Sequence, residues 1–397
     1  PYTIDINSKR YEFYAKNGYL FKDKHESSLG LIISGSLHQN ESLFGTKTYT
    51  GEQKNWYANL IFQTALSKKH KLSTGASLNY DSYAETLNTN PFNNNESTPG
   101  IFAEYTFNQL DKFIILAGAR ADYSSLYGLF FTPRLHLKYA LAKSFNLRAS
   151  AGKGYRTPNV LAENSFLLAS SRTINIANDL KQEEAWNYGI TATAHIPIYK
   201  RELTLQGEYF YTNFINQTVS DLDSNPHEAN LINIHKGSFA NSIQLEASME
   251  ILKGWTLTAA HRITDSKQTI KGELREKPLT NRYKSLITTS YQTPLKKWQF
   301  DFTAQLNGGG RMPNPDVNNP LWNKEFKPYS VFNAQITKYF RTWSIYIGSE
   351  NIGNYTQNNP IIDVANPSGS NFDATMIWGP VHGRKIYAGL RWALPKK

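Results

Sequence analysis

The sequence predicts an all-β fold, specifically a transmembrane antiparallel β-barrel. Three observations indicate it: about seventeen segments alternate apolar and polar residues, the composition favours strands, and the connections alternate between short turns and long polar loops. Short turns at one end and long loops at the other are typical of an outer-membrane barrel, with its turns on the periplasmic side and its loops outside.

The composition is rich in aromatic side chains and poor in sulfur. The 397 residues include 24 Tyr, 21 Phe and 8 Trp beside 3 Met and no Cys. Aromatic residues favour strands, and the lack of cysteine excludes disulfides, thiolate metal sites and cysteine nucleophiles. No run approaches the roughly 18 apolar residues that a membrane helix needs. Any passage through a membrane is therefore expected to use strands.

The net charge of +11 is spread over short clusters that fall between the predicted strands. These clusters are 68–71 (KKHK), 200–201 (KR), 296–297 (KK) and 396–397 (KK). We interpret them as solvated turns. A protein that binds nucleic acid gathers its charge on one face, so no nucleic-acid partner is expected.

The predicted strands are illustrated by residues 56–62, where Trp56, Leu60 and Phe62 share one face and Tyr57 lies on the other. In chain order the strands are centred near Phe13, Ser34, Leu60, Ala76, Ala103, Ala117, Leu135, Arg148, Ile190, Gln206, Gln244, Thr258, Thr288, Thr303, Asn333, Ile347 and Ala388. Many exceed the usual length of roughly five or six residues and approach the roughly 9 to 11 that a tilted membrane strand needs.

The predicted connections fall into two classes. Short links follow Ala65, Phe107, Tyr139, Ile196, Met249, Gln292 and Tyr339. Long polar links are predicted near 40–53, 84–98, 156–183, 215–238, 267–282, 308–328 and 353–383. This alternation predicts a meander whose two ends differ.

Three tryptophans distinguish a membrane barrel from a soluble sandwich, whose strands also alternate. Trp255, Trp298 and Trp343 each stand first in a strand that leaves a short turn, so we expect them at one height. An indole favours the bilayer interface because it has an apolar body and a polar N–H. Soluble hairpins with buried tryptophans are the alternative. The polar faces carry Glu208, Glu246, Arg262, Asp301, Glu350 and Arg391, which suit a hydrated or plugged lumen.

An odd number of strands does not close an ordinary bacterial outer-membrane barrel. If residues 385–392 form the last strand of a larger, even-numbered barrel, every short turn falls on the same side. We therefore expect residues 1–397 to be the C-terminal part of a barrel that lacks its first strands.

Several motifs resemble those of TonB-dependent outer-membrane receptors. GYRTP (154–158) followed by NDLKQE (178–183) resembles the paired signature of that family. NIHK (233–236) with QLEA (244–247), and SENIGN (349–354), are similar to its later strand signatures. The resemblance spans essentially the whole chain, although NDLKQE lacks the proline of the motif and the chain ends in LPKK rather than an aromatic residue.

The resemblance implies a 22-stranded barrel with an N-terminal plug, of which this chain supplies strands six to twenty-two. It implies a cell outer-membrane location and active import without enzymatic chemistry. The partners it implies are the TonB complex, reached through the missing plug, outer-membrane lipids, a small-molecule ligand and, as a further candidate, a surface lipoprotein. The predicted cargo is a ferric siderophore or other iron complex. Cobalamin and a passive, plug-less porin-like barrel are the alternatives.

The candidate ligand-binding residues lie in the predicted outer loops. Arg156 and Arg172 offer guanidinium groups that match the carboxylates of an anionic siderophore. Tyr155, Trp322 and Trp378 offer stacking surface. For all five residues, contacts within the protein are the alternative role.

Other chemistries find less support in the sequence. Haem receptors of this family commonly place a histidine inside the paired motif, but residues 158–178 contain none, and His227 and His235 bracket a different loop. Asp316, Asp363 and Asp373 lie in Asn-rich loops without the spacing of a calcium loop. No hydrolase, zinc or phosphate-loop signature is present. We predict no catalytic residues, no metal site and no resident cofactor.

Overall fold

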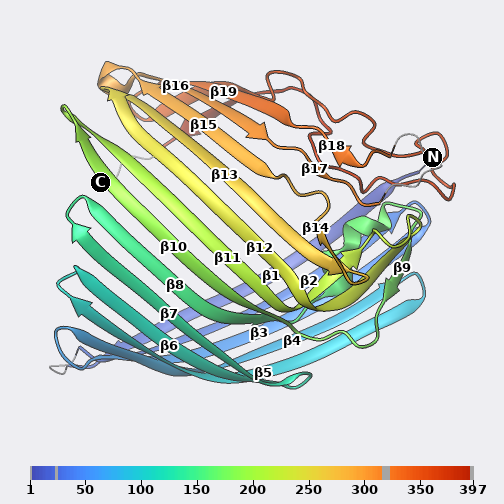
Figure 1. Cartoon of the computed structure of the whole chain (residues 1–397), viewed down its shortest axis with the longest axis horizontal. Coiled ribbons are helices and arrows are strands. Elements are labelled where there is room, and N and C mark those ends of the chain that lie inside the picture. Colours follow the sequence, from blue (N-terminus) through green and yellow to red (C-terminus); the bar gives the residue numbers. More distant parts are fainter. Residues whose placement is uncertain (1, 23–25, 315–321, 394–397) are drawn as a thin grey trace.

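The computed structural model describes residues 2–22, 26–314 and 322–393, most of which form one strongly curved sheet (Figure 1). All seventeen predicted strands are confirmed. They are β1 (Ile4–Leu20), β2 (Ser28–Phe44), β3 (Lys47–Ala65), β4 (His70–Leu87), β5 (Asn90–Gln109), β6 (Phe113–Ser124), β7 (Gly128–Ala142), β8 (Phe145–Arg156), β10 (Glu183–Ile198), β11 (Arg201–Asp221), β12 (Glu228–Leu252), β13 (Trp255–Ile270), β15 (Tyr283–Gln292), β16 (Trp298–Asn307), β19 (Tyr329–Tyr339), β20 (Trp343–Glu350) and β21 (Lys385–Trp392).

The remaining elements are short and lie in the connections. They are α1 (Val160–Glu163), η1 (Ser165–Leu168), β9 (Thr173–Ile176), β14 (Glu273–Glu276), η2 (Pro294–Lys296), β17 (Gly310–Arg311) and β18 (Glu325–Phe326). Within the described ranges, no helix has the length and apolar character needed to cross a membrane.

The long strands pair with their neighbours in chain order, all antiparallel, as an up-and-down barrel requires. β9 is different, because it adds to β12 in parallel. In the described part of the chain, β1 pairs only with β2 and β21 only with β20. The described sheet thus has seventeen long strands, and its membership in a larger, 22-stranded barrel stays a prediction.

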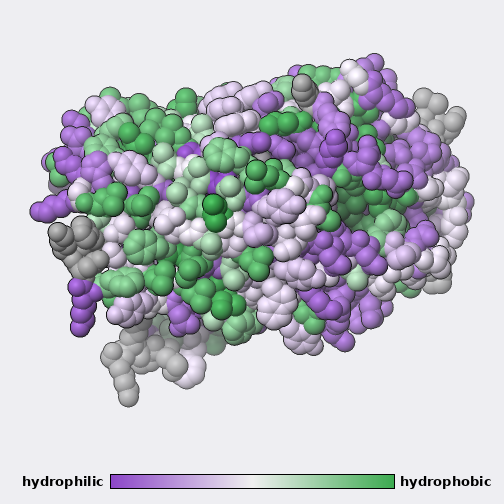
Figure 2. Space-filling model, turned by 90° about the horizontal axis from the view of Figure 1, so that it is seen from below, coloured by the Kyte–Doolittle hydropathy of each residue, from purple (hydrophilic) through white to green (hydrophobic). Residues whose placement is uncertain are grey.

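The two faces of the sheet differ as the alternation predicts. On β12, Ile243 and Leu245 point outward and are 48% and 64% exposed. Between them, Gln244 turns to the inner face, where its Oε1 accepts from Nε of Arg262 at 2.9 Å. Figure 2 shows hydrophobic side chains over the left and centre of one outer face and hydrophilic ones over the right. An apolar outer band with a polar interior is the arrangement of a barrel in lipid.

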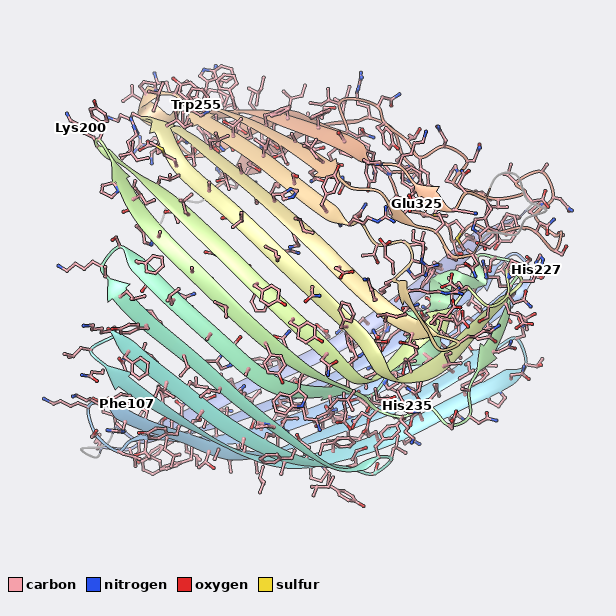
Figure 3. The ribbon with its side chains drawn as sticks, viewed as in Figure 1. Phe107, Lys200, His227, His235, Trp255 and Glu325 are labelled. Carbon is pink, nitrogen blue, oxygen red and sulfur yellow. The ribbon has the colours of Figure 1, made fainter. Side chains whose placement is uncertain are left out.

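The predicted short turns are confirmed and gather at one end, where Figure 3 places Phe107, Lys200 and Trp255. Trp255 begins β13, and Trp298 and Trp343 likewise begin β16 and β20, each with 38–39% exposure. At the turn before Trp255, a Cβ on Gly254 (φ 81°) would lie 2.3 Å from the carbonyl oxygen of Gln292. Only glycine fits this turn.

The prediction of long loops at 40–53 and 84–98 is wrong. β2 and β3 stay paired up to Phe44 and Lys47, and β4 and β5 up to Leu87 and Asn90, so only two residues join each pair. The loop predicted at 215–238 is shorter than expected and consists of residues 222–227. Within the loop predicted at 267–282, β13 continues to Ile270 and forms a hairpin with β14. These strands are longer than a bilayer requires. Where both faces of a strand meet water, polar residues occupy both faces and alternation disappears, so a strand reads as a loop.

The genuinely long connections are 157–182, 308–328 and 351–384. Their described parts, residues 157–182, 308–314, 322–328 and 351–384, fold together at the loop end of the sheet and are here called the cap. Its larger buried cluster contains Leu167, Leu222, Ala229, Leu231, Met312, Trp322, Phe326, Ile362 and Met376. A second cluster joins Leu161, Leu168 and Ala169 to Phe44, Tyr49 and Leu87 at the strand tips. Within the described residues, both of these buried apolar clusters therefore lie at the loop end of the sheet.

Candidate functional site

Residues 157–182, here called the strap, lie across the loop end of the sheet between β8 and β10 (Figure 1). Pro158 cannot continue the strand ladder, so β8 ends at Arg156. The strap then forms α1 and η1, and the Asn164 side chain donates from Nδ2 to the carbonyl oxygen of Val160 at 2.8 Å. Its apolar residues contact both buried clusters of the cap. The strap thus links strand tips with the other long loops.

Arg172 is the polar centre of the strap. Its side chain is 1% exposed, and Nε donates to Oδ2 of Asp373 at 2.9 Å, across 201 residues of sequence. Nη1 donates to the carbonyl oxygen of Glu228 at 2.9 Å. Lys47, at the tip of β3, donates to the carbonyl oxygens of Ser170 and Arg172 at 2.7 Å each. Buried charges need such partners, so this cluster joins the strap to the 351–384 connection and to the tips of β3 and β12.

A pocket of about 600 Å³ lies beside the strap, here called the cap pocket. Its lining combines four aromatic side chains from the cap with exposed charged and amide groups. The lining residues are Met312, Trp322, Asn323, Lys324, Glu325, Phe326, Lys327, Tyr355, Gln357, Asn358, Asn359, Ile362, Met376 and Trp378. Phe326 and Trp378 stack with ring centroids 5.2 Å apart and planes inclined by 14°. The pocket therefore has an aromatic wall and a polar rim.

The charge of the cap pocket is positive. Glu325 pairs with Arg282 at 2.7 Å, which lowers the pKa of the carboxyl through a hydrogen bond and charge attraction and keeps it ionised. Within the described part of the chain, exposed Lys324 and Lys327 have no ion pair. Burial raises the pKa of Tyr355, so its phenol remains a neutral hydrogen-bond donor at neutral pH. This combination suits an anionic ligand with flat or polarisable groups.

Contacts of the β17–β18 hairpin hold the wall of the cap pocket in place. The β17–β18 pair fixes Phe326 opposite Gly310, and the main-chain N–H of Met312 donates to the carbonyl oxygen of Lys324 at 2.9 Å. Arg311, next to Gly310, grips Asp223 through Nη1 and Nη2 at 2.7 and 2.8 Å. A two-pronged arginine–carboxylate contact fixes orientation as well as distance. The pocket is thus built on an anchored hairpin.

A second pocket of about 250 Å³ lies on the inner face, under the start of the strap. It is lined by Asn79, Asp81, Tyr83, Asn94, Glu96, Thr98, Arg120, Tyr155, Arg156, Thr157, Pro158 and Asn159. Both arginines are neutralised, Arg120 by Asp122 and Arg156 by Glu163 and Glu183. Asp81 and Glu96 face each other across β4 and β5 with only neutral partners in the described ranges. This pocket is therefore negative, unlike the cap pocket.

The five candidate residues fall into three places. Trp322 and Trp378 meet in the cap pocket, and Tyr155 and Arg156 meet in the inner pocket. Arg172 lines neither, but its guanidinium carbon lies 5.2 Å from the ring centroid of Trp322. The role of all five in binding a ligand stays a prediction.

The sequence did not reveal Lys324 and Lys327 as pocket residues or Asp373 as the partner of Arg172. No local pattern could have found the latter pair, because the cap brings together residues 201 positions apart. The other loop candidates are dispersed. His227 contacts the carbonyl oxygen of Ser370 at 3.0 Å at the loop end, well apart from His235 in Figure 3. Asp316 lies outside the described residues.

Comparison of the sequence and the fold with known proteins identifies a family. The sequence matches the family described as TonB dependent receptor-like, beta-barrel, over residues 2–352. No curated protein matches the sequence at a significant level.

Solved structures resemble the fold. A double mutant of the ferric enterobactin receptor PfeA from Pseudomonas aeruginosa superimposes with a TM-score of 0.72 at 15% identity, covering 96% of this chain and 62% of that one. The copper transporter OprC gives a TM-score of 0.72 at 13% identity, covering 98% and 65%. The siderophore receptor PirA from Pseudomonas aeruginosa gives 0.67 at 11%, covering 98% and 64%. The chain thus spans less than two thirds of the length of these structures.

Proposed function

Because this chain belongs to the TonB-dependent receptor family, whose outer-membrane β-barrel it contributes to, we propose that the full-length protein actively imports an anionic iron complex of the ferric siderophore type. The observation that carries this proposal is the positive, aromatic-walled cap pocket at the loop end of the sheet. Cavities of this size, with a few placed polar groups, are typical of sites for small molecules. The names of two structural neighbours, a ferric enterobactin receptor and a siderophore receptor, support the cargo class.

The proposed partners follow from the family. The TonB complex of the inner membrane would supply the energy by acting on a plug domain in the lumen. Lipids would surround the apolar outer band, and a surface lipoprotein is a further candidate partner at the cap. Neither catalysis nor a resident cofactor is part of the proposal, because binding followed by a driven change in the plug accounts for import.

Neutralising the rim of the cap pocket tests the cargo class. In the full-length receptor, Lys324→Gln combined with Lys327→Gln is expected to weaken binding of a ferric tris-catecholate, a strongly anionic chelate, by about ten-fold at low salt. The loss should shrink as salt is added, because exposed charges are screened. Equilibrium titration at two ionic strengths measures both effects.

A matched control neutralises two lysines at the opposite end, Lys296→Gln with Lys297→Gln, and should leave the affinity unchanged. Equal weakening in both double variants would show a general effect of net charge. No weakening in the cap variant would contradict the proposed anionic cargo in this pocket.

A further inference from the structure

The seven predicted short turns share a pattern that the proposed import does not use. Each turn carries an apolar residue that is at least 40% exposed, followed one or two positions later by Lys or Arg. These pairs occupy 66–68 (LSK), 110–112 (LDK), 141–143 (LAK), 199–200 (YK), 252–253 (LK), 295–296 (LK) and 340–341 (FR). An exposed apolar residue beside a cation suits the headgroup layer of an anionic membrane, where each finds its preferred surroundings.

The backbone of three of these turns shows that the apolar residue is not required by the turn itself. Leu110, Tyr199 and Leu295 have φ values of 52°, 55° and 64°, a left-handed conformation that glycine or asparagine adopts more readily. All three side chains are more than 80% exposed, so packing within the described residues does not compensate for this conformation. Such a choice of residues points to a contact outside the chain.

Lys338 is the best-defined cation at this end of the sheet. It alternates with Thr337, which is buried, and shares the outward face of β19 with Ile336, which is 41% exposed. Its Nζ lies 4.8 Å from the ring centroid of Trp298 and 5.3 Å from that of Phe340. Among the described residues, Lys338 has no partner in an ion pair. Two aromatic rings thus hold an ammonium group at the level of the interfacial tryptophans without supplying an anion.

Further cations lie next to Lys338, and the neighbouring turns carry no carboxylate. The main-chain N–H of Tyr339 donates to the carbonyl oxygen of Lys297 at 2.8 Å, which places exposed Lys297 beside β19. Exposed Arg341 follows in the next turn. Residues 292–298, 338–344 and 385–393 contain no Asp or Glu. A lysine on the lipid-facing side is tolerated at the interface, where phosphate oxygens can supply the anion.

We propose that Lys338, Lys297 and Arg341 form a site for the phosphate of an anionic phospholipid in the periplasmic leaflet of the outer membrane. The acyl chains continue along the apolar outer face of β16 and β19, where Phe300 and Ile336 lie opposite each other and are each 41% exposed. Cations that adjoin an apolar face match both parts of a lipid, whereas a free anion needs only the cations. The site lies at the opposite end from the cap, so it does not depend on the identity of the cargo.

Lys338→Gln with Arg341→Gln tests the site, because it removes two cations and keeps the apolar face. The full-length receptor in a nonionic detergent is titrated with phosphatidylglycerol or with phosphatidylcholine of the same acyl chains, and native mass spectrometry counts the bound lipids. We expect the wild type to prefer phosphatidylglycerol by about ten-fold and the variant to prefer it by less than about three-fold. Lys324→Gln with Lys327→Gln removes the same charge at the cap and should keep the wild-type preference.

Four results would overturn the proposal. A wild type without a preference for phosphatidylglycerol shows that the two rings and water alone hold Lys338. A preference that survives in the Lys338 variant places the selectivity elsewhere, and an equal loss in both double variants shows a general effect of net charge. Displacement of the lipid by inorganic phosphate, but not by sodium chloride of the same ionic strength, assigns the site to the free anion. Both double variants should migrate as folded barrels without heating, so that a loss of bound lipid reports on the site rather than on unfolding.

Discussion

Asp373→Ala is expected to release the strap from the cap while the sheet stays folded. The change leaves the Arg172 guanidinium buried without its carboxylate, and removing one partner of a buried pair costs about 3–5 kcal/mol. Lys47 lies close by, bonded to the carbonyls of Ser170 and Arg172, so two cations would remain without an anion in direct contact. Hydrogen exchange of residues 157–182, measured by mass spectrometry, should rise by two or more orders of magnitude on this scale.

A double variant separates the charge effect from simple loss of contact. Arg172→Met with Asp373→Ala removes both buried charges and should recover part of the protection, because no unpaired charge is left. The strands β15 and β16 serve as the internal control and should exchange as in the wild type. Unchanged protection of the strap in Asp373→Ala would contradict the role given to this ion pair.

Leu245→Lys is expected to impair assembly of the barrel in the outer membrane. Leu245 is 64% exposed on the outer face and pairs with Gly207 and His261 on the adjacent strands. A lysine facing lipid costs about 2–4 kcal/mol near the middle of the bilayer and less toward the interfaces. The fraction of folded receptor in isolated outer membranes, read from its altered migration without heating, measures the effect.

Gln206→Lys is the matched control, one residue from the level of Leu245 but on the inner face. Gln206 lies opposite Glu246 and donates to Glu208 at 2.6 Å, so a lysine there would find two carboxylates. Assembly should be normal. A soluble protein would show the reverse ranking, because a lysine at an exposed position would be harmless.

The membrane-spanning part of the fold could be predicted because lipid and lumen impose opposite polarity on adjacent residues. Gln244 and Leu245 show this alternation, and their neighbours repeat it along β12. The prediction that Trp255, Trp298 and Trp343 lie at one level of the barrel likewise has a single physical cause, because an indole favours the interface between membrane and water. These signals are local, so one sequence suffices to reveal them.

The cap could not be predicted in the same way. Its contacts join residues far apart in the chain, such as Arg172 with Asp373 and Arg311 with Asp223. No periodic pattern of apolar and polar residues in the sequence indicates such contacts. Above the membrane both faces of a strand meet water, which is why residues 40–53 were expected to form a loop although they are paired strands. Aromatic and arginine residues in loops pointed to Trp322, Trp378 and Arg172 as candidates, but only the structure shows that Trp322 and Trp378 share a pocket and that Arg172 supports it.

Energy-coupled uptake tests the central claim most directly. Cells that carry the full-length receptor as their only route for a radioactive ferric tris-catecholate are compared with and without a functional TonB complex. We expect accumulation only when both the receptor and the TonB complex are present, and a reduced initial rate for Lys324→Gln with Lys327→Gln. Accumulation without the TonB complex would indicate a passive barrel, and no accumulation with both present would contradict import of an anionic iron complex.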